Sequence, residues 1–109
     1  MLPRSGKNKA VRLQNAIRDI LYEMYPKLRP GDIKTAVMGE SGIDIILSPT
    51  AQDMIPFDIE AKNTERLNLW DSIAQAEANA VQGRIPLVVF KRNRSEIYAI
   101  IKFDHLLEL

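Results

Sequence analysis

Hydrophobic and polar residues along this chain follow two spacings, one typical of helices and one typical of strands. Spacing of three to four residues over 8–25 predicts an amphipathic helix that ends at Pro26. A second helix is expected over 67–82, stopped by Gly83. The apolar stripes expected to face the core are Leu13, Ile17, Ile20, Leu21 and Met24 in the first helix, and Leu69, Trp70, Ile73, Ala76, Ala80 and Val81 in the second.

Five short segments are rich in the β-branched and apolar residues that favour strands. They are residues 32–39, 43–47, 56–62, 86–90 and 96–102. The segment 86–90 is apolar throughout, which is typical of a strand covered on both faces. Residues 48–55 carry turn chemistry and are expected to form a hairpin-like connection, whereas 103–109 should close the chain as a short helix or tail.

The resulting order, α-β-β-β-α-β-β, predicts an α/β fold with a mixed central sheet flanked by helices. Because a helix joins the third and fourth strands, those two strands should be parallel. A length of 109 residues suits one domain, so 1–109 is expected to be a single unit with 1–7 as a flexible basic tail.

Composition narrows the possible chemistry. The chain has no cysteine and one histidine, which excludes thiolate metal sites and most histidine-based catalysis. His105 is expected to be a capping or surface residue. With no apolar run of membrane-spanning length and no leader pattern, a cytoplasmic location is expected. The net charge of +1 gives no sign of nucleic-acid binding by itself.

Three reactive side chains are expected to meet where the second and third strands pair. Glu60 and Lys62 share one face of their strand, because side chains alternate with a period of two. Pairing would bring Asp44 beside them. Adjacent carboxylates need a neutralising cation, and their hard oxygens suit Mg²⁺, with Mn²⁺ able to substitute. An ordinary Glu/Lys pair on a surface hairpin is the alternative.

The elements Gly42-x-Asp44 and Glu60-x-Lys62, followed by a helix, resemble the PD-(D/E)xK nuclease superfamily. With Ser41 before the glycine, the particular likeness is to small Holliday-junction resolvases and phage-type endonucleases. The resemblance implies a restriction-endonuclease-like core and a magnesium-dependent, structure-selective DNA endonuclease. It also implies a role in DNA recombination and a homodimer, in which the apolar Leu106-Leu107-x-Leu109 end could take part. Host and viral origin both remain open.

The resemblance also implies roles for individual residues. Asp44 and Glu60 would hold the metal together with the main-chain carbonyl of Ala61. Lys62 would position the attacking water or help to deprotonate it.

Related nucleases often carry a glutamate on the first helix and a glutamine on the second. The best-placed residue of the first helix is an amide, Gln14, which either holds a metal-bound water or is a helix-surface glutamine. Gln75 matches the glutamine of the second helix, although it lies opposite the apolar stripe. Glu40 is either a supplementary acid or a turn residue.

Two basic clusters are candidates for contact with a DNA backbone. One lies within residues 1–18, in the expected tail and the start of the first helix, and the other lies in the turn after the fourth strand. The candidate DNA-binding residues are Lys7, Lys9, Arg12, Ser41, Lys91, Arg92 and Arg94. A solvated tail and a charged turn are the alternative. Two other functions also remain open, a DNA-binding module that has lost cleavage and a metal-free adaptor.

Overall fold

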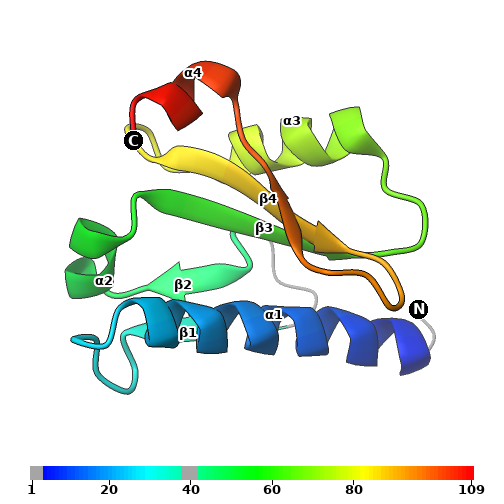
Figure 1. The fold of residues 1–109 in the computed structure, drawn as a ribbon, viewed down its shortest axis with the longest axis horizontal. Helices are drawn as coiled ribbons and strands as arrows, with labels where there is room; N and C mark the ends of the chain where they lie inside the picture. Colours follow the sequence, from blue (N-terminus) through cyan, green and yellow to red (C-terminus); the bar gives the residue numbers. More distant parts are fainter. Residues whose placement is uncertain (1–3, 38–41) are drawn as a thin grey trace.

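The computed structural model describes residues 4–37 and 42–109, with side chains from residue 8 onward. The elements are α1 (Arg4–Met24), β1 (Ile33–Thr35), β2 (Ile45–Leu47), α2 (Pro49–Met54), β3 (Phe57–Asn63), α3 (Leu69–Asn79), β4 (Ile85–Lys91), β5 (Tyr98–Ile100) and α4 (Phe103–Leu107) (Figure 1). None of these helices is long and apolar enough to cross a membrane. The chain is thus an α/β protein in the predicted order, with α2 inserted and α4 at the end.

The strands form a mixed sheet and a separate ribbon. In the sheet, β4 lies between β3, to which it is parallel, and β5, to which it is antiparallel. The parallel pair confirms the prediction made from the connecting helix. The expected pairing of 43–47 with 56–62 is wrong, because β2 pairs with β1 and α2 separates it from β3. A backbone hydrogen bond from Asp44 to Ile59 O, of 3.1 Å, still joins the two segments.

The helix α2 replaces the hairpin-like connection expected over 48–55. Ser48 is its N-cap, and the Ser48 hydroxyl accepts the Ala51 N–H at 3.1 Å. Pro49 occupies the first turn, where its missing N–H costs nothing. Ala51 and Ile55 are fully buried, so the helix is held by packing as well as by its cap. Serine and proline favour both turns and the first residues of helices. This is why a turn was predicted where the structure has a helix.

Helices cover both faces of β3. The helix α1 packs against β1 and β3, and α3 packs against β3 and β4 (Figure 1). Leu13 and Ile17 of α1 are buried against the strands. Ile20 and Met24 of the same helix were also expected in the core but are exposed. The contact between α1 and the strands therefore buries only part of the apolar stripe of this helix. Because α1 begins at Arg4, residues 4–7 are helical, where a flexible tail was expected.

The orientation of α3 differs from the expectation. Leu69, Trp70 and Val81 are exposed, Trp70 by 75%, although all three were assigned to the core. Ala76 of the expected stripe is buried as predicted, and Ser72, which was not part of the stripe, is buried with it. The reason is that α3 covers the polar face of β3, so its inner face is polar as well.

The end of α3 also differs from the expectation. The helix α3 stops at Asn79 with Ala80 as its C-cap, three residues before the expected end at 82. Gly83 has φ +89° and lies in the turn that leads to β4, where a left-handed backbone is required.

Candidate active site

Asp44 is fixed beside the edge of β3. Its carboxylate Oδ2 accepts the Ala61 N–H at 2.7 Å, while its own N–H donates to Ile59 O. In a strand, the N–H and C=O of one residue point to the same side. The carbonyl of Ala61 therefore faces the edge on which Asp44 lies.

Glu60 is buried, with 4% of its surface exposed, on the opposite side of β3 from the α1 core. Burial and the nearby charge of Asp44 raise the pKa of Glu60. Burial also raises the pKa of Asp44, and the hydrogen bond from Ala61 opposes that rise. Asp44 thus binds the residue next to Glu60, and its charge bears on the Glu60 carboxyl, although strand pairing is not what brings them together. That the two acids form a metal site stays a prediction.

Two amide side chains of α3 face this pair. Lys62 Nζ donates to Gln75 Oε1 at 2.7 Å. One turn further along, Asn79 Nδ2 donates to Glu60 Oε1 and to Gly42 O, both at 3.3 Å. Asn79 was not predicted as a site residue. Its spacing of four residues from Gln75 placed both amides on one face, but that face was expected to point away from the sheet.

Of the other residues predicted to belong to the site, Gln14 lies in the described part of the chain, whereas some lie outside it or have no described side chain. Gln14 is 6% exposed, so it is not a helix-surface residue. Its burial beside Leu13 places it on the face of α1 that packs against the strands. Ser41 and Glu40 lie outside the described residues, and of Lys7 only the helical backbone is described.

The donor set fits a hard divalent cation. Within residues 4–37 and 42–109, no three His, Cys, Asp or Glu side chains gather to hold a metal. Asp44, Glu60 and the Ala61 carbonyl would supply oxygen ligands only. Magnesium suits such a set, because it commonly keeps several waters and binds through one or two carboxylates.

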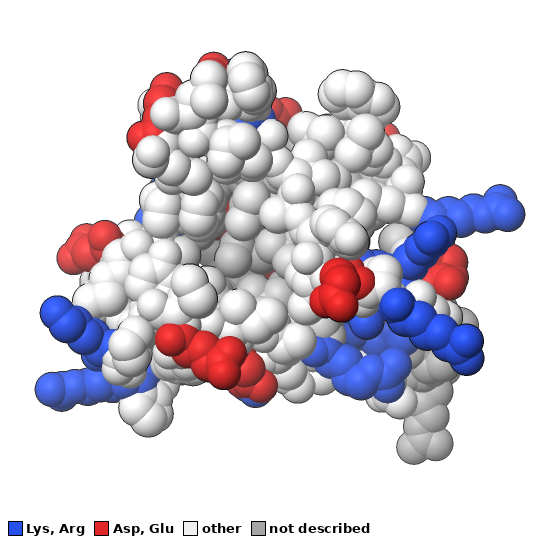
Figure 2. All heavy atoms as spheres, in the orientation of Figure 1, with Lys and Arg blue, Asp and Glu red and all other residues white. Residues whose placement is uncertain are grey.

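The predicted basic clusters come together at one end of the molecule. Lys9 and Arg12 of α1 line a depression of about 470 Å³ together with Lys91 and Arg94. Figure 2 shows Lys and Arg side chains gathered over this end. Arg92 lines a neighbouring depression on the other side of the turn. Asn63, the residue after Lys62, also lines the depression and donates to Lys9 O of α1 at 2.9 Å, so the basic surface begins at the Lys62 end of β3 but on the α1 face, opposite Glu60.

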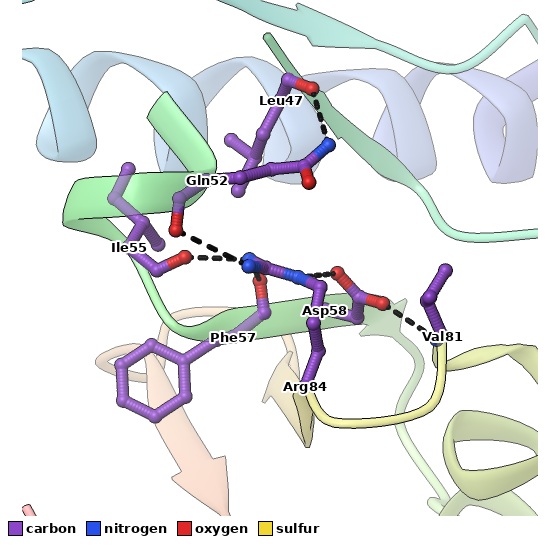
Figure 3. Close-up of polar contacts among 7 residues, drawn as sticks. All are labelled: Leu47, Gln52, Ile55, Phe57, Asp58, Val81 and Arg84. Carbon is purple, nitrogen blue, oxygen red and sulfur yellow. Dashed lines mark hydrogen bonds and ion pairs between the residues drawn. The ribbon is translucent and has the colours of Figure 1, made fainter. Parts of the chain in front are cut away.

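Asp58 shares its strand face with Glu60 but belongs to a different cluster. Its Oδ1 accepts Arg84 Nε at 2.7 Å, and its Oδ2 accepts the Val81 N–H at 2.8 Å. The guanidinium also donates to main-chain carbonyls of α2 and β3 (Figure 3). Asp58 is therefore a structural residue, whose carboxylate already has partners.

Replacing Glu60 with glutamine should stabilise the metal-free protein. The variant keeps an acceptor for Asn79 and removes a buried charge, so we expect the free energy of unfolding to rise by about 1 kcal/mol or more at pH 8. A raised pKa in the folded state means that stability is lost as pH rises. The gain should therefore vanish below pH ~4, where the carboxyl is protonated in both states.

Urea unfolding followed by circular dichroism at pH 4 and pH 8 measures this difference. Glu23→Gln, at an exposed site on α1, is the matched control and should leave stability nearly unchanged. A loss of stability in Glu60→Gln at pH 8 would show that the carboxylate has a neutralising partner in the free protein.

Comparisons with protein-family models, with curated proteins and with solved structures found no match. What the site does is therefore inferred from its own geometry. That geometry is two adjacent carboxylates, one deeply buried, with an amide-held ammonium beside them and a basic surface at the same end of β3.

Proposed function

We propose that this chain is a metal-dependent endonuclease that hydrolyses DNA phosphodiester bonds. The observation that supports it most strongly is the placement of Asp44 and Glu60, which repel each other in the free protein. Such an arrangement costs stability. It is explained if the pair binds a cation, and phosphodiester hydrolysis is a reaction that such a cation serves.

Each residue of the site then has a chemical role. Asp44, Glu60 and the Ala61 carbonyl would hold Mg²⁺, or Mn²⁺ in its place. The ion supplies Lewis-acid polarisation of the phosphate and stabilises charge on the departing oxygen. Lys62 is held by Gln75, so its ammonium can orient a water or stabilise negative charge on the phosphate. The predicted role of Gln14 in holding a metal-bound water stays a prediction, because Gln14 lies on the α1 side of β3 and Glu60 lies on the other side.

The basic depression would carry the DNA backbone toward the acidic pair. Its cations come from α1 and from the β4–β5 turn, so a strand bound there would pass the end of β3. A chain of 109 residues has little surface for reading base sequence, which favours recognition of DNA structure. We therefore propose that the substrate is branched DNA, as it is for resolvases, that the core is restriction-endonuclease-like, and that the protein acts in DNA recombination.

The homodimer stays a prediction. Leu106, Leu107 and Leu109 at the end of the chain are exposed, as an interface between two copies would require. Origin from a phage and location in the cytoplasm also stay predictions.

The alternative is a DNA-binding module that has kept the fold and lost cleavage. One observation favours it, because the first helix offers the amide of Gln14 where related nucleases often place an acid. Both functions need the basic depression. Only the nuclease needs the acidic pair to bind a metal.

A cleavage panel tests the proposal. Labelled four-way junction, flap and linear duplex DNA are incubated with the protein and Mg²⁺ or Mn²⁺, and we expect the junction or flap to be cut fastest. Calorimetry with Mn²⁺ should give binding heat that disappears in Asp44→Asn. Metal binding without cleavage of any substrate would reject the nuclease, and absence of both would favour the binding module or an adaptor.

A further inference from the structure

An acidic side chain, Glu65, lines the neighbouring depression and contacts two residues that line the basic one, Lys9 and Asn93. Glu65 Oε2 accepts the Asn93 N–H at 2.6 Å and lies 3.8 Å from Lys9 Nζ. Glu65 belongs to the loop after β3, and Asn93 belongs to the β4–β5 turn. The carboxylate therefore bridges the β4–β5 turn and α1, the elements that line the depression.

The donors around this carboxylate are those that proteins use for phosphate oxygens. A backbone N–H and an ammonium converge on one oxygen atom, with Arg94 lining the same depression. The Glu65 side chain is 52% exposed, so water reaches the contact and the ion pair with Lys9 is weak. A ligand that carries its own anion could displace it at little cost.

The turn that supplies the N–H contains a strained residue, Arg94. Arg94 has φ +63°, a left-handed conformation that a glycine would adopt without strain. The turn is closed by the Ser95 N–H, which donates to Arg92 O at 3.2 Å. An arginine at this position adds a cation to the depression at a cost in backbone strain, a combination often found at functional sites.

We infer that the Glu65 carboxylate occupies the place of a phosphodiester group in the free protein, and that a phosphate of a nucleic-acid strand displaces it on binding. Glu65 follows Lys62 by three residues, at most ~11 Å of chain. The displaced position would therefore anchor the strand at the Lys62 end of β3. This inference rests on the proposed function for its ligand, but its test needs neither metal nor cleavage.

The test compares Glu65→Gln with Glu23→Gln, which removes the same charge from the far half of α1. Fluorescence anisotropy with a labelled 30-nucleotide single strand and its duplex, in EDTA, gives the affinity of each protein. We expect Glu65→Gln to bind DNA about threefold to fivefold more tightly than the wild type, because a competing anion of exposed ion-pair strength is removed. Glu23→Gln should change affinity by less than about twofold, as expected of an exposed charge far from the depression.

Arg94→Gly supplies a second measurement. Glycine accepts the backbone conformation, so the melting temperature should not fall, while the loss of a phosphate contact should weaken binding and reduce the salt slope by about one. Unchanged or weaker binding by Glu65→Gln, relative to Glu23→Gln, would overturn the inference and show that Glu65 only pins the turn. Gain for inorganic pyrophosphate alone, without gain for DNA, would overturn it too.

The outcomes separate this inference from the proposed nuclease. Tighter DNA binding by Glu65→Gln in a protein that cuts nothing would support the phosphate site and reject the enzyme. Cleavage by the wild type with no gain in Glu65→Gln would do the reverse. No DNA binding by either protein would reject the phosphate site together with the DNA substrate.

Discussion

Replacing Arg84 with alanine is expected to destabilise the fold by about 3–5 kcal/mol, because it leaves the Asp58 carboxylate buried without its cation. Asp58 is 4% exposed, and the ion pair is 2.7 Å long. The same guanidinium donates to Ile55 O at 2.5 Å, Phe57 O at 2.9 Å and Gln52 O at 3.2 Å (Figure 3). The variant therefore also removes donors from carbonyls at the end of α2 and the start of β3.

Urea unfolding followed by far-ultraviolet circular dichroism measures the loss. Trp70 is exposed, so its fluorescence would report unfolding poorly. Arg18→Ala is the matched control: Arg18 pairs with Asp19 at the surface, and its removal should cost less than about 1 kcal/mol. The double variant Asp58→Leu/Arg84→Met removes both charges and should lose less than Arg84→Ala. Equal losses in Arg84→Ala and Arg18→Ala would mean that water screens the buried pair.

Sequence patterns predicted those parts of the fold that depend on the local spacing of apolar residues and on which element connects two strands. A helix between two strands implied that β3 and β4 are parallel, and the structure has them so. The Asp58–Arg84 pair was not predictable in this way, because 26 residues separate its partners and no spacing rule joins them. The helix α2 had its start signal in Ser48, but the same signal also favours a turn.

The candidate site shows why one face of a helix was misjudged. Hydrophobic spacing in α3 selected Leu69 and Trp70 as the buried stripe, on the assumption that a sheet face is apolar. The face of β3 under α3 carries Glu60 and Lys62, so the side of α3 that fits it carries amides. Asn79 is half-buried there and binds Glu60, whereas Gln75 is exposed at the edge of this face and binds Lys62. A polar strand face covered by a helix is thus itself a sign of a functional site.

Replacing Lys62 with alanine is expected to reduce DNA cleavage by at least ~100-fold while leaving DNA binding in EDTA within about twofold of the wild type. The ammonium lies close enough to Asp44 and Glu60 to lower the pKa of both, and Gln75 holds it there. Its removal takes away the group that would orient water or stabilise negative charge on the phosphate. Single-turnover cleavage of the best substrate in the panel, with saturating protein and Mg²⁺, measures the effect on the chemical step.

Lys34→Ala, at an exposed lysine of β1, controls for the loss of a positive charge and should cut at the wild-type rate. Asp44→Asn should lose cleavage to the same extent as Lys62→Ala but should also lose Mn²⁺ binding heat. The two variants then separate the role of the metal ligand from that of the lysine. Cleavage that persists unchanged in both would come from a contaminating nuclease. Cleavage lost in Asp44→Asn but kept in Lys62→Ala would leave water activation to the metal alone, with Lys62 acting only as a counter-charge to the acidic pair.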